Sequence, residues 1–149
     1  MQIEAVAVDP SDDIYIGDGA GRIRRIDAQT GLISTAVGVG LPGYSGNGGL
    51  ATQAKIGTPT AIDFDSAGNL YFADKIYHVV CRVSMEGIIT TIAGHGEAGF
   101  SLDGTSATRA RINLPYGLCG ERFINKGWCA WEKRTLFFCQ ESNEKAKRV

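Results

Sequence analysis

The chain has 149 residues, of which 44% are hydrophobic and 21% are charged, and its formal net charge is −1. This composition is typical of a soluble globular domain and excludes a chain dominated by disorder. Uncharged apolar runs are only a few residues long, whereas a membrane-spanning helix needs ~20, and the N-terminus lacks the pattern of a secretory signal. The four cysteines, Cys81, Cys119, Cys129 and Cys139, form no CxxC pair. We therefore expect a globular protein without a membrane span, while its compartment stays undecided.

Charge is divided unevenly along the chain. Residues 1–118 contain eight Lys and Arg against twelve Asp and Glu, whereas residues 119–149 contain seven against four. An acidic body opposes the contacts with phosphates on which nucleic-acid binding depends. We therefore expect no nucleic-acid partner, and we interpret the arginines of the body as parts of solvated faces.

Four short strands are predicted in the first part of the chain. EAVAVD (residues 4–9) is rich in strand-forming residues and ends at a polar turn, and IYIGD (14–18) alternates with the period of two that is typical of strands. RIRRI (22–26) continues the alternation, and LISTAV (32–37) follows the turn glycine Gly31. The pattern predicts a four-stranded antiparallel meander.

A glycine-rich segment, GYSGNGGLATQAKIGTP, follows at residues 43–59. One interpretation is an anion-binding nest of backbone N–H groups. We favour an architectural interpretation, in which Gly43, Gly46, Gly48 and Gly49 take positive φ angles in a tight connection and ATQAKI forms a short helical turn. A phosphate-binding P-loop is excluded because no GKS or GKT follows.

The whole pattern returns about 56 residues later. The strands recur as TAIDFD, LYFAD, HVVCRV and IITTIA, and the loop recurs as GFSLDGTSATRARINLP at residues 99–115. Gly99, Gly104 and Pro115 take the places of Gly43, Gly48 and Pro59. A segment that recurs at a fixed period is an architectural unit, and four strands per repeat are typical of a propeller blade, which must stack on its neighbours.

These residues resemble the NHL-repeat β-propellers, in the subgroup whose blades are joined by a loop similar to GYSGDGGPATxAxLxxP. The resemblance covers residues 3–118 and departs from the pattern at Asn47 and Leu50, and more strongly in the second loop at Leu102, Thr105 and Ser106. It implies an all-β fold of propeller blades, with about six blades in a closed ring. It also implies a rigid platform whose loops bind proteins or glycans.

Three segments follow from this alignment. Residues 1–59 are predicted to be the first blade with its loop, and residues 60–118 the second blade with its loop and the start of a third. The repeat pattern then stops, and residues 119–149 form a divergent tail that we expect to be either helical or disordered. Two blades leave open apolar faces, so we expect an incomplete propeller that either belongs to a longer protein or associates with other copies.

Three carboxylates are weak candidates for metal ligands. Asp18 and Asp74 close the second strand of each repeat, and Asp103 lies among the glycines of the second loop. The alternative, which we favour for the first two, is that each carboxylate accepts hydrogen bonds from the N–H groups of the next turn. We assign no metal, cofactor or catalytic residue, because no nucleophile, base and orienting group can be assembled from the sequence.

Three functions of different classes remain. The leading one is a non-enzymatic repeat scaffold that binds a protein or a glycan. The second is a fragment of a metal-dependent lactonase-like or lyase-like propeller enzyme, and the third is a truncated product without independent activity.

Overall fold

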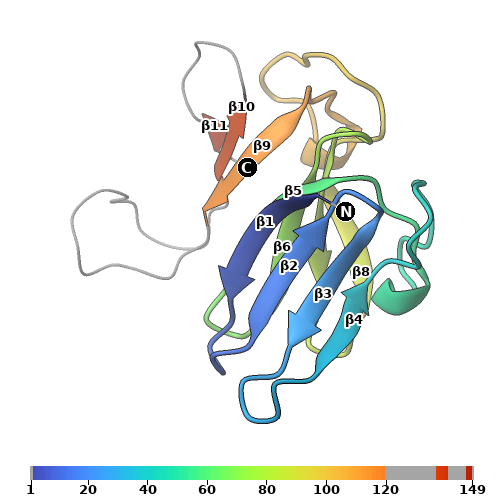
Figure 1. Cartoon of the computed structure of the whole chain (residues 1–149). Helices are drawn as coiled ribbons and strands as arrows, with labels where there is room; N and C mark the ends of the chain where they lie inside the picture. Colours follow the sequence, from blue (N-terminus) through green and yellow to red (C-terminus); the bar gives the residue numbers. More distant parts are fainter. Residues whose placement is uncertain (1, 120–136, 141–146, 149) are drawn as a thin grey trace.

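The computed structural model describes residues 2–119 together with the strands at residues 137–140 and 147–148. Two four-stranded antiparallel sheets dominate it, and each sheet keeps the chain order of its strands (Figure 1). Blade 1 consists of β1 (Ile3–Val8), β2 (Ile14–Asp18), β3 (Arg22–Ile26) and β4 (Ile33–Val37). Blade 2 consists of β5 (Pro59–Phe64), β6 (Leu70–Asp74), β7 (Val79–Val83) and β8 (Ile89–Ala93). The predicted all-β class and the two blade-type meanders are confirmed.

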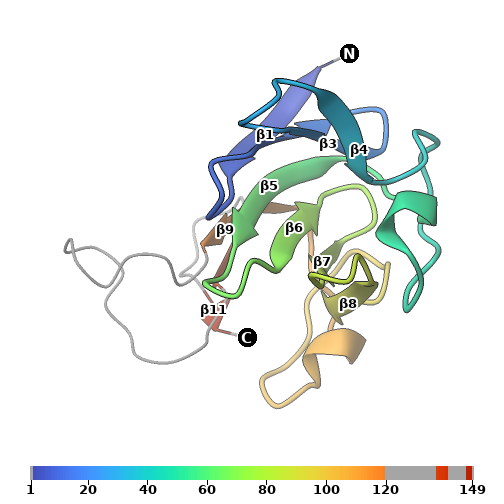
Figure 2. The same cartoon turned by 90° about the horizontal axis from the view of Figure 1, so that it is seen from below.

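The two blades stack face to face, as Figure 2 shows from below. Strands β1 and β5 are neighbours across the stack, and a core of apolar side chains fills the space between the sheets. Phe64 and Phe72 of blade 2 are 2% and 0% exposed, and Ile23 of blade 1 is 0% exposed. The Tyr15 ring meets the Phe64 ring edge to face at 4.7 Å. Because strand side chains alternate between faces, residues two positions apart, such as Ile62 and Phe64 of β5, point into this core together.

A third sheet begins beside blade 2. It has the order β11-β10-β9, with β9 at Pro115–Cys119, β10 at Phe137–Gln140 and β11 at Lys147–Arg148. Strand β9 packs against β5 and β6, and the Thr60 hydroxyl donates a hydrogen bond of 2.7 Å to the Pro115 carbonyl oxygen. Most of the tail, which we expected to be helical or disordered, lies outside the described residues. The two described pieces of it after Cys119 are extended strands, not helices.

The face of blade 1 that points away from blade 2 is apolar and open. Val6, Val8, Ile14 and Ile33 are 59%, 45%, 39% and 55% exposed. Their repeat counterparts in blade 2 are all buried, at 8% for Ile62, 2% for Phe64, 5% for Leu70 and 4% for Ile89. Blade 1 covers those counterparts, so the same sheet surface is buried in one blade and exposed in the other.

Long loops connect the sheets at one end of the blades. Loop 1 (residues 38–58) contains the short helix η1 (Ala51–Gln53), and loop 2 (residues 94–114) contains η2 (Ala107–Arg109). Both are single 3₁₀ turns, which fits their lack of side-chain caps. Within the described ranges, no helix has the length and apolar character needed to cross a membrane.

Candidate binding surface at the interblade loops

Asp18 is a fully buried carboxylate at the end of β2. Its Oδ1 atom accepts hydrogen bonds of 3.0 Å from the backbone N–H groups of Ala20 and Arg22. Its Oδ2 atom accepts a hydrogen bond of 3.2 Å from Arg22 Nε, which also neutralises its charge. The carboxylate therefore holds the turn between β2 and β3.

Asp74 occupies the equivalent place in blade 2 and is bound more extensively. Oδ2 accepts a hydrogen bond of 2.6 Å from Gly57 N–H, and Oδ1 accepts bonds of 3.0 to 3.3 Å from the N–H groups of Thr58, Ile76 and Tyr77. Burial raises the pKa of Asp74, and the four backbone hydrogen bonds oppose that rise. Asp74 thus ties the end of loop 1 to the turn between β6 and β7.

The third candidate ligand, Asp103, lies on the exposed tip of loop 2. Asp18 and Asp74 belong to different blades and each is enclosed by its own turn, so the three carboxylates do not converge. Within residues 2–119, no group of three or more His, Cys, Asp or Glu side chains could hold a metal ion. Asp18 and Asp74 therefore have a structural role, because both accept hydrogen bonds from the N–H groups of turns.

The loop glycines have unequal roles. Gly46, Gly48 and Gly104 have positive φ angles of 92°, 84° and 88°, which favour glycine, whereas Gly43 and Gly49 do not have positive φ. The prediction of positive φ is therefore wrong for these last two. A Cβ atom at Gly43 would lie 2.9 Å from the Lys55 side chain, so close packing is the constraint there.

The remaining residues of the repeated motif mark the ends of the loops. Gly99 has a φ of 151° and also packs closely, since a Cβ atom there would lie 3.0 Å from the Arg111 side chain. Pro59 and Pro115 are the first residues of β5 and β9, where a strand tolerates the missing N–H group.

Loop 1 continues past its own blade and pairs with the outer edge of β8. Gly48 N–H donates to the Ile89 carbonyl at 2.8 Å, and Ile89 N–H donates to the Gly49 carbonyl at 3.0 Å. Ala51 N–H donates to the Gly87 carbonyl at 2.8 Å. Backbone groups on the edge of a sheet otherwise invite pairing with another chain, so the loop protects this edge.

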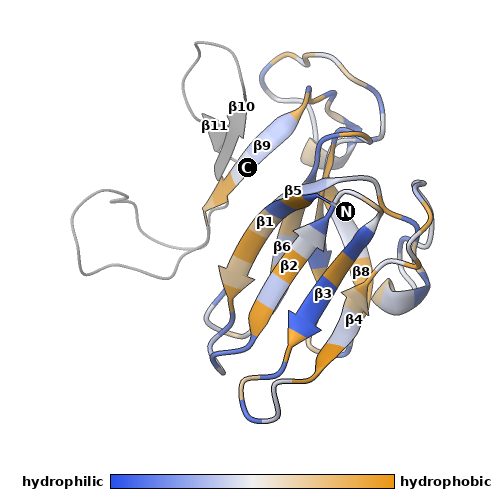
Figure 3. Cartoon of the chain, in the orientation of Figure 1, coloured by the Kyte–Doolittle hydropathy of each residue, from blue (hydrophilic) through white to orange (hydrophobic). Residues whose placement is uncertain are grey.

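Exposed apolar and aromatic side chains lie on the two loops, on the turn after β6 and on β9, and Figure 3 colours parts of the loops as hydrophobic. We call this the loop surface, and it comprises Leu41, Tyr44, Ile76, Phe100, Leu102 and Tyr116, which are 38% to 81% exposed. The Tyr44 ring is stacked on the Tyr77 ring at 6.0 Å, and its hydroxyl lies 2.9 Å from the Thr91 hydroxyl. These two contacts hold the Tyr44 side chain in place.

Two charged side chains join the blades beside this surface. Lys75 Nζ lies 3.1 Å from Glu4 Oε2 and 5.6 Å from the centre of the Tyr116 ring. The ion pair links blade 2 to the first strand of blade 1, and the cation faces the aromatic ring of β9. The three sheets therefore meet at one polar and aromatic cluster.

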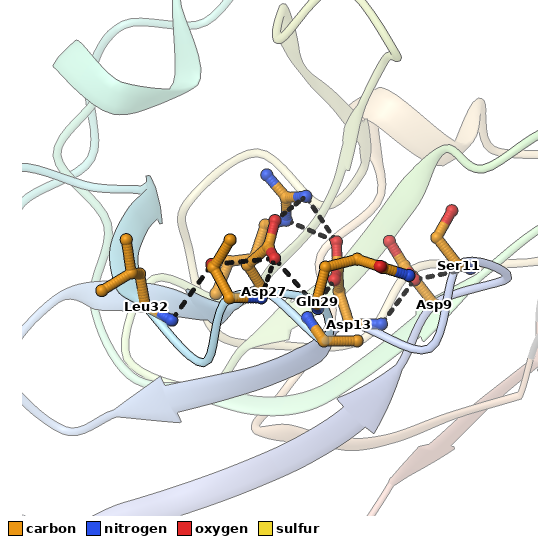
Figure 4. A network of polar contacts seen from close by, with 9 residues as sticks. Asp9, Ser11, Asp13, Asp27, Gln29 and Leu32 are labelled. Atoms are coloured by element: carbon orange, nitrogen blue, oxygen red, sulfur yellow. Dashed lines mark hydrogen bonds and ion pairs between the residues drawn. The ribbon is translucent and has the colours of Figure 1, made fainter.

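A different polar network lies at the opposite end of the blades, beside a cleft of about 580 Å³ between blades 1 and 2 (Figure 4). Asp13 is 4% exposed and accepts hydrogen bonds of 2.7 Å from Arg25 Nε and from Ala28 N–H. Hydrogen bonds from Thr30 lower the pKa of Asp27, which also lies 3.4 Å from Arg25. The network fixes the turn between β3 and β4.

This network was not predicted from the sequence. The available signal was that the same two positions are polar in both repeats, as Asp13 with Arg25 in blade 1 and as Asn69 with Arg82 in blade 2. In blade 2 the Arg82 guanidinium donates to Asn69 Oδ1 at 3.0 Å. Only the pairing of β2 with β3 and of β6 with β7 brings these residues together.

The fold places the chain in a structural class, because it is built of β-propeller blades. No protein-family model matches the sequence, and no curated protein sequence matches it. Solved structures do match. An auxiliary nutrient binding protein from Bacteroides thetaiotaomicron is 22% identical with a TM-score of 0.66, and one from Bacteroides ovatus is 24% identical with a TM-score of 0.65. In both comparisons, 89% of this chain and 33% of the other chain are covered.

An enzyme is also among the similar structures. Virginiamycin B lyase from Staphylococcus aureus is 15% identical with a TM-score of 0.56, and the comparison covers 99% of this chain and 37% of the lyase. The chain spans about a third of the length of these structures. At these identities the similarity concerns the fold alone.

Proposed function

We propose that the chain is part of a non-enzymatic β-propeller scaffold that binds a protein or a glycan through the loop surface. The observation that carries this proposal is the set of exposed aromatic and aliphatic side chains on loops held by backbone hydrogen bonds. Aromatic side chains with little conformational freedom are typical of binding sites, because little entropy is lost when a ligand contacts them. Membership of the NHL-repeat family, which the loop motifs suggest, is part of this proposal.

The similar structures support a binding role without specifying the ligand. Two of them are described as auxiliary nutrient binding proteins, and their blades resemble those of this chain in fold. Since the chain covers a third of their length, a complete propeller would contribute further loops beside the ones described. The proposed class of ligand, a protein or a glycan, therefore rests on the exposed side chains of this chain's own loop surface.

The alternative, a fragment of a lyase-like or lactonase-like enzyme, has the fold of the lyase as its support. A metal-dependent mechanism would need carboxylate oxygens that are free to bind a cation. Asp18 and Asp74 instead use both oxygens to accept hydrogen bonds within the protein. This geometry favours the scaffold over the enzyme.

The proposal is tested by binding measurements on the full chain. Oligosaccharides are titrated into the isotopically labelled protein, and the amide signals are followed by NMR. Purified protein partners are measured by surface plasmon resonance. We expect signals of loop 1, loop 2 and β9 to shift, and we expect Tyr44→Ala and Phe100→Ala to weaken binding.

The control is Met85→Ala, because Met85 is 70% exposed but lies beside the cleft at the opposite end of the blades. A ligand that binds all three variants equally would contradict the assignment of the loop surface. Turnover of a bound ligand, detected by mass spectrometry, would favour the enzyme.

A further inference from the structure

A histidine side chain holds the end of loop 2. His78 lies in the turn between β6 and β7, and its Nδ1 atom accepts a hydrogen bond of 3.1 Å from the Leu114 N–H. Leu114 is the last residue of loop 2, directly before β9. The Pro115 carbonyl, next along the chain, accepts the hydrogen bond from Thr60. Two side chains of blade 2 therefore hold the point at which the third sheet begins.

The backbone is strained at both ends of the His78–Leu114 hydrogen bond. Among the described residues, three residues other than glycine have positive φ angles, and His78 and Leu114, at 50° and 43°, are two of them. A residue with a side chain rarely adopts this conformation, and strain of this kind persists only where the surrounding structure enforces it. An observed strain is thus a reason to look for a role of the two residues that bear it.

Blade 1 has a glycine at the place of His78. A Cβ atom at Gly38 would collide with the carbonyl oxygen of Gly21, and a Cβ atom at Gly94 would collide in the same way with that of His78. Gly21 is therefore the equivalent residue, and its φ of 81° suits glycine. A Cβ atom at Gly21 would itself lie 2.8 Å from the Ile56 carbonyl oxygen of loop 1. A side chain between the turn and the end of the loop is thus specific to blade 2.

The repeat explains why this loop end needs a different acceptor. At the end of loop 1, the Thr58 N–H donates to the Asp74 carboxylate at 3.3 Å. Leu114 is the repeat counterpart of Thr58, but the counterpart of Asp74 after one more period is Ala130, whose side chain has no acceptor. The Leu114 N–H donates to His78 instead. The acceptor at this place therefore changes from a carboxylate to an imidazole.

We propose that His78 is a pH-sensitive latch for the end of loop 2, the latch being its hydrogen bond with Leu114. A neutral imidazole can accept through Nδ1, whereas an imidazolium carries a proton on both ring nitrogens and can only donate. Histidine ordinarily changes its charge between about pH 5 and about pH 8, and His78 is only half-buried, so protons reach it. Below this range the Leu114 N–H loses its acceptor and the end of loop 2 detaches from the turn, while Thr60 still holds β9.

The neighbouring charged groups have partners of their own. The titratable groups on the elements around His78 are Asp74, Lys75 and Tyr77 on its own turn, His95 and Arg111 on loop 2, and Tyr116 on β9. Lys75 pairs with Glu4, and Arg111 pairs with Glu97 at 2.9 Å. Four backbone N–H groups donate to Asp74, and burial raises its pKa. The titrations of Asp74 and His95 must therefore be separated from that of His78.

The latch also bears on the loop surface. Phe100 lies on loop 2, and Tyr116 follows Leu114 by two residues, so an open latch loosens the segment that carries both rings. Binding by the loop surface should then weaken as the pH falls. This consequence rests on the proposed function, whereas the latch itself does not.

The first test is an NMR titration of the full chain, labelled with ¹⁵N, from about pH 7.5 to about pH 5. At the upper pH we expect the His78 ring to carry its proton on Nε2, because Nδ1 is the acceptor. The Leu114 amide signal should move with the same midpoint as the His78 ring signals. Its protection factor against hydrogen exchange should fall about fivefold or more across this range.

Three variants make the test specific. His78→Gly places in blade 2 the residue that blade 1 has at Gly21, so we expect it to fold, with the Leu114 amide unprotected at both ends of the pH range. His78→Asn also tolerates a positive φ, and its amide does not titrate, so its Leu114 signal should be the same at both pH values. His95→Gln is the control, in which Leu114 should titrate as in the parent chain.

Three outcomes would overturn the latch. They are a Leu114 signal that does not change with pH in the parent chain, one that still titrates in His78→Gly or in His78→Asn, and one that follows the Asp74 carboxyl carbon in place of the His78 ring. A ligand of the loop surface that binds at no pH would contradict the proposed function and leave the latch standing, because the titration is measured without ligand.

Discussion

Asn47 Oδ1 accepts a hydrogen bond of 2.6 Å from the backbone N–H of Thr91, and so joins the loop that leaves blade 1 to the outer edge of blade 2. The two residues are 44 positions apart in the sequence. Their contact shows why the glycine-rich loop is long: it must reach around its own blade to cover the edge of the next one. An uncovered edge strand can pair with another chain, and the loop prevents this by covering the edge of β8.

The contribution of this contact can be measured with a matched pair of variants. We expect Asn47→Ala to lower the free energy of unfolding by about 0.5–1.5 kcal/mol, because the hydrogen bond from Thr91 N–H is lost and water can replace it in part. Asp103→Ala, at the equivalent position of loop 2, should leave the unfolding free energy of the dilute monomer unchanged. Urea unfolding followed by circular dichroism gives both values, and equal losses would contradict the difference between the two loops.

The two buried carboxylates should also differ in their contributions. Asp74→Asn places an amide N–H₂ group against at least one of four backbone donors. We therefore expect the free energy of unfolding to fall by about 2–3 kcal/mol. Asp18→Asn should cost less, about 1 kcal/mol, because the Arg22 side chain facing Oδ2 is 34% exposed and can turn toward water. Thermal unfolding of both variants checks the order, and a larger loss for Asp18→Asn would contradict it.

The pKa of Asp74 should be observable by NMR of its carboxyl carbon. Burial raises this pKa, so the folded state holds its proton to higher pH than the unfolded state does. The stabilisation that comes from protonation of Asp74 is therefore fully present below the ordinary pKa of an aspartate and is lost as the pH rises through the raised value. A carboxyl signal that titrates at or below the ordinary aspartate pKa would contradict this assignment.

Asp65 provides the opposite case in the same blade. Burial opposes ionisation, but hydrogen bonds from Asn69 and Tyr71 outweigh it and lower the pKa of Asp65. Its contribution to stability is present above the ordinary aspartate pKa and is lost as the pH falls through the lowered value. The same NMR titration should therefore separate the two carboxyl signals, and Tyr71→Phe should move the Asp65 signal back toward the ordinary pKa.

Cys81 should be unreactive in the folded protein. It is 3% exposed, and burial raises its pKa to about 12, so almost no thiolate is present at pH 8. Cys119 is exposed and serves as the internal control. Alkylation with iodoacetamide followed by peptide mass spectrometry should label Cys119 before Cys81, and labelling of Cys81 without unfolding would show that the stack of blades opens.

Much of the fold could be predicted from local pattern. The eight strands of the two blades begin and end within two residues of the predicted runs, because alternation of apolar side chains and turn residues such as Gly31 and Gly87 are local signals. The short turns between the runs predicted the antiparallel order within each sheet. The φ angles of Gly43 and Gly49 were predicted wrongly, since a glycine can be required by a neighbouring side chain as well as by its own backbone.

The candidate surface could not be predicted in the same way. Nothing in the sequence near Asn47 indicates that its amide faces Thr91, and Asp13 and Arg25 are paired only because β2 lies beside β3. By itself the sequence determined the strands, the turns and the repeat, since these depend on neighbours in the chain. The tertiary structure decided which apolar face is covered, which strand edge is open and which carboxylates are occupied, because burial and hydrogen bonding depend on residues distant in the sequence.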